Sequence, residues 1–209
     1  ELLKEYVAPS SMDGIDFAAV DYESLKADQR FAALVKDLEK FDLRQLQSRE
    51  QELAFWINVY NIAAVKLIVE NYPVNSIRDI GSILSPVWKK TAIVVDAKAY
   101  TLHFIEHGLL RKMGDARMHF AIVCASLSCP DLRRDAYTAE RLDQQLDDQS
   151  TLFLQNSMKG LRLNGDKKIV YVSSIFKWFK KDFGGAGGVK EFIAPYVSQD
   201  VGGFSLKYL

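Results

Sequence analysis

Cysteine and histidine are both scarce in this chain. Its 209 residues include two cysteines and three histidines. Cys124 and Cys129 lie close together in the sequence, so the chain can close at most one internal disulfide. The pair fits a structural disulfide, a redox-active pair or two free thiols, and this observation alone leaves the cellular compartment open.

The chain also lacks a net charge and a long apolar run. Lys and Arg together number 27, as do Asp and Glu, so no net field attracts a nucleic-acid backbone or an anionic membrane. The one compact basic stretch, residues 177–181, spreads over a predicted helix face. No run of about eighteen or more apolar residues is present. We therefore predict no nucleic-acid partner and no membrane span.

Apolar residues, by contrast, make up 48% of the chain, which is enough for a substantial core. The length fits one domain, and no internal repeat or linker interrupts it. We predict a single domain over residues 1–209, with residues 1–24 as a wrapping N-terminal arm of little regular structure. The chain starts at Glu1, which fits a processed secreted protein and a trimmed protein equally well.

The segment from Ser48 to Tyr72 is predicted to be the central helix. Ser48 and Gln51 have the spacing of a capping box, and Pro73 ends the helix. The segment is apolar on nearly every side, which is typical of a helix buried in the middle of a domain.

Two polar residues, Asn58 and Asn61, interrupt this apolar helix. Their separation of three places both on one face, and a buried Asn needs hydrogen-bond partners. One interpretation is that they bind the backbone of loops. The other is that one of them orients a catalytic group or donates to a developing oxyanion.

Hydrophobic periodicity and turn residues define the other predicted elements. They are a surface helix over 28–42, a helical turn over 76–80, a hairpin over 91–101, a helix over 102–113, a strand over 118–123, a helix over 138–156, a hairpin over 161–172, a helix capped by Ser174 and a last helix ending near Pro195. The glycine run 184–188 follows a helix, so it is not a dinucleotide-binding loop. Together these elements predict an α+β fold with a small antiparallel sheet packed on the central helix.

Cys124 is the candidate nucleophile, because the predicted strand ends there and delivers it to a turn. A thiol becomes a nucleophile when a histidine or a helix N-terminus stabilises its thiolate. His107, on the preceding predicted helix, is free of any strand geometry that would keep it from Cys124, so it is the candidate base. His119, five residues before Cys124, would point to the opposite face of a strand. The competing interpretation is that Cys124 is a small buried core residue.

Glu106 and Cys129 raise two further alternatives. Glu106 is about 100° from His107 around a helix, so it is badly placed to orient that ring, and its other candidate partners are His119, Arg111 and Arg133. Cys129 is placed to form a disulfide that hides Cys124 until it is reduced. The alternative is a permanent structural disulfide without catalysis.

His103, Glu106 and His107 also match a His-x-x-Glu-His zinc pattern. Two histidines four residues apart on one helix face can bind zinc, with the glutamate as base. A third ligand is needed, for which Glu140 and Glu191 are the candidates. This zinc hydrolase is the third hypothesis, and the leading one requires no metal or cofactor.

The chain resembles a known family, domain of unknown function 547 (DUF547). The resemblance covers most of the chain and rests on residues 53–61 (LAFWINVYN), 76–80 (SIRDI), 105–111 (IEHGLLR), 119–130 (HFAIVCASLSCP), 176–179 (FKWF) and 182–184 (DFG). It implies an α+β architecture related to papain-like and transglutaminase-like proteins. It also implies a Glu-His-Cys constellation, carried here by Glu106, His107 and Cys124.

Other properties of the family bear on the site and the compartment. His103 lies outside the family's usual pattern, which weakens the zinc hypothesis. Bacterial members often carry export signals, so the resemblance implies an extracytoplasmic protein after signal-peptide removal, with the cytoplasm as the alternative. Members usually end in a Tyr-Asp-Trp-x-Leu-Asn run, whereas this chain ends at Lys207-Tyr208-Leu209, so we expect a terminal segment to be missing.

The leading hypothesis is a cysteine-dependent hydrolase or acyl transferase acting on a peptide or amide. Cys124 attacks, His107 moves the proton, and Asn58 or backbone amides near Ser126 stabilise the oxyanion. The rival is a non-catalytic domain that binds a protein partner. In that case Asn58, Asn61, His107 and Arg133 brace the core.

Overall fold

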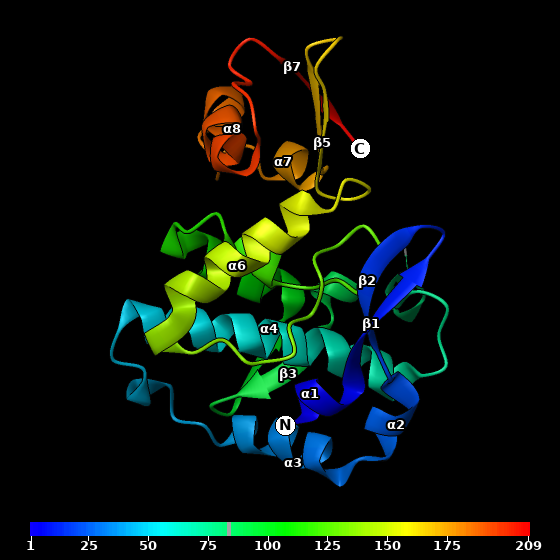
Figure 1. Ribbon diagram of the computed structural model, residues 1–209. Coiled ribbons are helices and arrows are strands. Elements are labelled where there is room, and N and C mark those ends of the chain that lie inside the picture. The colour runs from blue at the N-terminus through cyan, green and yellow to red at the C-terminus, as the bar shows by residue number, and fades with distance from the viewer. Residues whose placement is uncertain (83–84) are drawn as a thin grey trace.

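The computed structural model describes residues 1–82 and 85–209, and helix α4 (Arg49–Asn71) lies at its centre. Figure 1 shows α4 running across the middle of the larger part of the molecule. The predicted capping box is confirmed, because the Ser48 hydroxyl accepts from the Gln51 N–H and the Gln51 side chain accepts from the Ser48 N–H. The helix ends before Pro73, as predicted.

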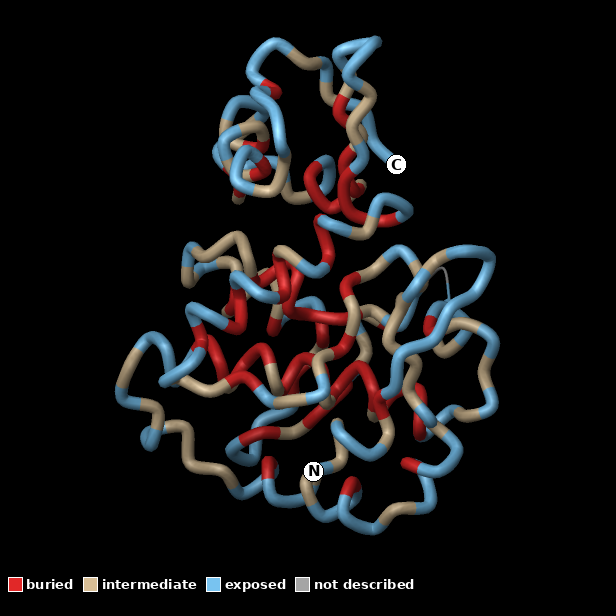
Figure 2. The backbone as a smooth tube through the Cα atoms, in the orientation of Figure 1, coloured by how far each residue is buried: buried red, intermediate tan, exposed pale blue. Residues whose placement is uncertain are grey.

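By length and composition alone, α4 could cross a membrane. However, 72% of its most apolar window is buried inside the fold. Leu53, Ile57 and Ala63 are fully buried. Figure 2 shows the same concentration of buried residues along the centre of the molecule. The apolar side chains of α4 therefore form the core of the protein.

The remaining elements come before and after α4 in the chain. In chain order they are α1 (Leu2–Tyr6), β1 (Val7–Met12), β2 (Ile15–Val20), α2 (Tyr22–Ala27), α3 (Gln29–Glu39), η1 (Leu43–Gln45), η2 (Ile77–Ile80), η3 (Val87–Lys89), β3 (Thr91–Val95), β4 (Lys98–Thr101), η4 (Phe104–Leu109), η5 (Leu110–Met113), α5 (Met118–Ala121), η6 (Ala139–Arg141), α6 (Leu142–Gln155), β5 (Leu161–Asn164), β6 (Ile169–Val172), α7 (Ile175–Trp178), α8 (Gly185–Ile193), η7 (Ala194–Tyr196) and β7 (Ser205–Tyr208). Of the η elements, η4 is a π-helix and the others are 3₁₀-helices. Elements on both sides of α4 in the chain pack around it, whereas β5, β7, α7 and α8 lie together beyond α6 (Figure 1).

The described strands form small separate sheets, so the predicted α+β class is confirmed. Strands β1 and β2 form one antiparallel pair, and β3 and β4 form another that contacts α4. The second pair is the predicted small sheet on the central helix. Strands β5 and β6 confirm the second predicted hairpin, and β7 adds to β6 in parallel. The predicted surface helix and the turn after Pro73 correspond to α3 and η2.

The prediction that residues 1–24 have little regular structure is wrong. They contain α1, a complete hairpin and the start of α2. Asp13 and Gly14 have φ angles of 53° and 76°, as a tight Asp-Gly hairpin turn requires. That dipeptide was the signal for the hairpin, but the polar residues of β1 obscured the strand alternation.

The predicted strand over 118–123 is also wrong. Residues 118–121 form the single helical turn α5, and all of them are buried. A short run that is buried on every side has no period that separates strand from helix. The helix predicted over 102–113 is likewise irregular, since it consists mainly of the π-helix η4 and the 3₁₀-helix η5 and closes at Gly114, whose φ is 73°.

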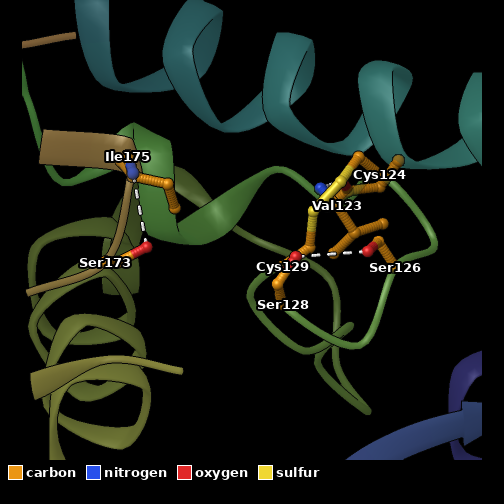
Figure 3. The surroundings of a disulfide bond; sticks show 8 residues. Val123, Cys124, Ser126, Ser128, Cys129, Ser173 and Ile175 are labelled. Carbon is orange, nitrogen blue, oxygen red and sulfur yellow. Dashed lines mark hydrogen bonds between the residues drawn. A yellow bond between two sulfur atoms is a disulfide. The ribbon is translucent and has the colours of Figure 1, made fainter. Parts of the chain in front are cut away.

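Two C-terminal details also differ from the predictions. The run 184–188 was expected to join two helices, but Gly185 to Gly188 form the beginning of α8. Ser174 is the N-cap residue of α7 but makes no capping hydrogen bond with its side chain. Its neighbour Ser173 accepts from the Ile175 N–H at 3.3 Å (Figure 3).

Two clusters of buried side chains meet at α5, a large one around α4 and a smaller one nearer the C-terminus. The smaller cluster joins Phe120 of α5 to Phe153 of α6 and Phe176 of α7. Met118 and Ala121, also on α5, belong to the cluster around α4. Helix α5 therefore lies where the two clusters meet, and the loop that carries Cys124 leaves from this junction.

Asn58 and Asn61 attach loops to α4 through paired hydrogen bonds. The Asn61 amide donates to the Ala121 carbonyl and accepts from the Val123 N–H, both at 2.9 Å. Asn58 makes the same two bonds to the backbone of Tyr137, at 2.8 and 3.0 Å. Of the two interpretations of these residues, the geometry supports the binding of loop backbone.

We predict that Asn61→Leu lowers the free energy of unfolding by about 2 to 4 kcal/mol, because it leaves two buried backbone groups without partners. Urea unfolding followed by circular dichroism measures the change. Asn71→Leu is the matched control, since Asn71 is exposed and bonds only the Leu67 carbonyl of its own helix. Its expected loss is about 0.5 kcal/mol or less. Equal losses in the two variants would contradict this account.

Candidate functional site

A cavity of about 740 Å³ brings together most of the residues that the sequence singled out. The loop after α5 forms one wall, η4 forms a second and α7 a third. Its lining includes Cys124, Cys129, Ser126, Glu106, His107, His119, His103, Tyr60, Trp88, Trp178 and Phe179. The volume lies within the range of about 300 to 1,000 Å³ that is typical of small-molecule sites.

Cys124 and Cys129 form a disulfide in the wall of this cavity, with Cα atoms 6.1 Å apart (Figure 3). Within their loop, the Cys129 N–H donates to the Ser126 carbonyl at 2.9 Å, and Ala125 adopts a left-handed φ of 51°. Both cysteines are half-buried. The sulfur pair therefore lies in a tight turn whose flanking hydroxyl residues, Ser126 and Ser128, are exposed.

A second wall of the cavity is the π-helix η4, which carries Glu106 and His107. π-Helical turns are rare and occur often at functional sites. The His107 Nδ1 lies 2.7 Å from Arg111 Nη1. A guanidinium can only donate, so Nδ1 accepts this hydrogen bond and the neutral ring carries its proton on Nε2.

Arg111 connects His107 to a second histidine through Asp182. The Arg111 guanidinium forms a bidentate ion pair with Asp182, at 2.6 and 2.7 Å. The same carboxylate lies 2.8 Å from His119 Nε2. A carboxylate accepts, so Nε2 of His119 donates and Nδ1 is the basic nitrogen of its neutral ring. The two histidines thus present opposite tautomers.

Burial and charge determine the protonation of this network. Burial lowers the pKa of His119 to about 4, although the Asp182 carboxylate opposes the shift. The Arg111 guanidinium holds the pKa of Asp182 below its usual value. Burial, aided by His103 and Arg111, lowers the pKa of His107. Both rings are therefore neutral near pH 7, while Asp182 is ionised.

Glu106 titrates differently from the other carboxyl groups of the site. Burial raises its pKa to about 7, and the charge of Arg111 and the hydroxyl of Tyr60 only partly oppose this shift. Among the described residues, the ion-pair partner of Arg111 is Asp182 and that of Arg133 is Asp135. His119 also pairs with Asp182, so none of the three predicted partners of Glu106 takes that role.

Three residues of the site were not identified by residue-level reasoning. Asp182 orients His119, and Phe179 stacks on the same ring with centroids 4.0 Å apart. Trp178 stands at the rim with 67% of its surface exposed. All three come from the chain near α7, far from Cys124 in the sequence. Their only signal was the family resemblance over 176–184.

The structure places the predicted supporting residues in two different regions. Asn58, Asn61 and Arg133 line a separate cavity of about 610 Å³ and not the Cys124 cavity. The oxyanion role expected of Asn58 therefore does not fit the geometry, since its amide bonds the backbone of Tyr137 and does not line the Cys124 cavity. Arg111 acts from behind the cavity wall, through His107 and Asp182.

The zinc pattern brings two histidines together. The ring centroids of His103 and His107 are 4.4 Å apart. Within residues 1–82 and 85–209, no group of three His, Cys, Asp or Glu side chains is arranged to hold a metal ion.

We predict that His119 makes stability depend on pH between about 6.5 and 4. The pKa of His119 is lower in the folded chain than in the unfolded chain, so the unfolded chain binds more protons in this window. The free energy of unfolding therefore decreases as the pH decreases. The full loss is about 3 kcal/mol, from about 1.4 kcal/mol per pKa unit. The His119→Gln variant lacks this pH-dependent loss. The difference in free energy of unfolding between wild type and variant should therefore be about 3 kcal/mol smaller at pH 4 than at pH 7.

Urea unfolding across this pH range provides the measurement. His103→Gln, which replaces an exposed histidine of the same cavity, serves as the matched control and should leave the pH dependence unchanged. The opposite contribution of Glu106, whose raised pKa costs stability as pH rises above about 4.5, is shared by all three proteins and cancels. An unchanged pH dependence in His119→Gln would contradict the burial of a neutral ring.

Comparison with known proteins identifies a family without a known activity. No curated protein and no solved structure matches the chain significantly. The family model described as "Protein of unknown function, DUF547" matches residues 43–154, which is more than half of the chain. The matched segment contains Glu106, His107, Arg111, His119 and both cysteines. The chain therefore belongs to the DUF547 family.

Proposed function

We propose that the cavity is the active site of a cysteine-dependent hydrolase or acyl transferase, related in its chemistry to papain-like and transglutaminase-like enzymes. The substrate is a peptide or another amide. The observation that carries the proposal is the meeting of Cys124 with Glu106, His107 and His119 in one cavity. A potential nucleophile and several acid–base groups of shifted pKa in one concave site are the usual features of an active site.

The hydrogen bonds support a division of roles between the two histidines. Asp182 holds the N–H of His119 and leaves a basic nitrogen, which is the arrangement of the orienting acid and the base in a catalytic triad. His107 was the base expected from the sequence, but its Nδ1 already accepts from Arg111. We therefore assign proton acceptance to His119 and hydrogen-bond donation, from Nε2–H, to His107.

Glu106 supplies a second acid–base group. With a pKa of about 7, this carboxyl is about half protonated at neutral pH and can give or take a proton there. The acidic member of the proposed constellation thus acts on substrate or water, and Asp182 performs the orienting role. Backbone amides of the loop near Ser126 remain our candidates for stabilising the oxyanion.

The disulfide must open before Cys124 can react. A dithiol reductant supplies two electrons and two protons, becomes a disulfide itself and leaves Cys124 and Cys129 as thiols. The Cys124 thiolate then attacks the carbonyl carbon, and the leaving amine departs with a proton from the site. Water or a second amine cleaves the thioester and restores the thiol. Reoxidation of the pair switches the enzyme off.

The disulfide also supports an extracytoplasmic location, because such bonds persist mainly in oxidising compartments.

The rival function, a binding or scaffold domain, is supported by one set of contacts. Asn58 and Asn61 brace loop backbone, and Arg133 pairs with Asp135 and the Gln145 carbonyl. These contacts explain Asn58, Asn61 and Arg133, but not the acid–base groups around Cys124.

Acyl transfer from p-nitrophenyl acetate to hydroxylamine tests the proposal. Reduced wild type should acquire one acetyl group on Cys124, detected by intact mass, and should turn over repeatedly. Oxidised wild type should be inactive. Cys124→Ser should lose on the order of 10³-fold or more in rate, whereas Cys129→Ser should be active without reductant. Equal turnover by reduced wild type and Cys124→Ser would refute the assignment of the nucleophile.

A further inference from the structure

A second, more apolar recess lies next to the Cys124 cavity, and residues of the disulfide loop line both. This apolar recess has a volume of about 240 Å³. It shares a boundary with the larger cavity along Asn75, Ser76 and Ile77 on one side. On the other side, the boundary is the disulfide loop itself, from Val123 to Pro130. Because the two cavities share these residues, a molecule whose carbonyl lies at Cys124 has the recess next to it.

Apolar side chains from three parts of the chain form the walls of the recess. Helix α4 contributes Val65 and Ile68, which are 7% and 5% exposed. Strand β2 contributes Ala18 and Val20, both half-buried and packed against a third buried cluster, which includes Val65, Leu25 and Phe31. Aromatic rings and further aliphatic groups complete the wall. They come from Phe17, Tyr22, Tyr72, Val74 and Leu132.

The recess offers no uncompensated charge. Among the described residues that line it, Asp131 is the ionisable acid, and its Oδ1 accepts from Lys159 at 2.7 Å and from the Ala18 N–H at 3.1 Å. The Lys159 side chain is 1% exposed, so this ion pair is enclosed in the fold. A charged ligand group would meet no free partner here, whereas an apolar group would lose only water.

We propose that the apolar recess is a specificity subsite that binds one apolar side chain, of leucine or phenylalanine size, from a peptide substrate. A volume of about 240 Å³ is smaller than a complete small-molecule site, which is typically about 300 to 1,000 Å³, and fits one side chain of a longer molecule. The proposal rests on the proposed function, because the same substrate presents its carbonyl to Cys124.

A series of N-alkyl iodoacetamides, from N-methyl to N-octyl together with N-benzyl, tests the recess without requiring turnover. Cys129→Ser is the parent protein, because it has one thiol, and reaction rates are normalised to those of glutathione. Each methylene that enters the recess should raise the rate by up to about fourfold, the equivalent of about 0.8 kcal/mol. The increase should stop when the recess is full.

A matched pair of substitutions on β2 locates the effect. Ala18→Phe fills the recess and should abolish the chain-length dependence. Ala19→Phe adds the same ring to the next residue, which lines neither cavity. It should leave the dependence intact. Rates that do not vary with chain length, or equal effects of the two substitutions, would overturn the proposal.

Ligand-observed NMR on oxidised wild type, with N-acetylphenylalaninamide as the probe, gives a readout that needs no thiol. Saturation transfer should occur in wild type and Ala19→Phe and be lost in Ala18→Phe, and its absence in wild type would count against the recess. Failure of the proposed function looks different. In that case the chain-length dependence and the NMR signal persist, while acyl transfer is absent.

Discussion

The Asn61 amide is the contact on which the geometry of the site depends. It lies on the central helix α4 and bonds the backbone on both sides of Ile122, at the point where the chain leaves α5. The disulfide loop begins directly after this attachment. The attachment to the core thus fixes the position of the loop. Cys124 therefore lines the cavity although it lies in irregular structure.

A single carboxylate then connects the C-terminal part of the fold to the site. Asp182 accepts from both Arg111 and His119, so it links η5, α5 and the segment after α7. This explains the different states of the neighbouring groups. The ionised Asp182 is matched by Arg111, while His119 and His107 stay neutral and the half-buried Glu106 retains a proton up to about pH 7. A site with one compensated charge and several neutral groups is suited to proton transfer near neutrality.

The sequence predicted the elements whose signals are local. The capping box at Ser48, the apolar run of α4 and the two hairpins after it needed only neighbouring residues. Features set by tertiary contacts were missed. The turn at Asp96 and Ala97 has left-handed φ angles without glycine because its amides bond the carbonyls at the end of α3.

The candidate site shows the same division. Cys124, His107 and Glu106 were found because they are chemically distinctive and near one another in the sequence. The role of His119 was missed because a strand was predicted over 118–123, and in a strand His119 and Cys124 would point to opposite faces. The segment instead forms the helical turn α5, to which this alternation does not apply. Asp182 pairs with His119 across 63 positions of the chain, and no local pattern predicts such a contact.

The central claim is that this network activates Cys124, and the pH dependence of Cys124 alkylation tests it most directly. Iodoacetamide would be used on Cys129→Ser, alone and combined with His119→Gln or His107→Gln, with folding checked by circular dichroism. In Cys129→Ser, we predict that the alkylation rate of Cys124 has its pH midpoint well below the free-thiol pKa of about 8.5. The His119→Gln substitution should raise this midpoint more than His107→Gln does. A midpoint at or above that value in the folded Cys129→Ser protein would contradict the account.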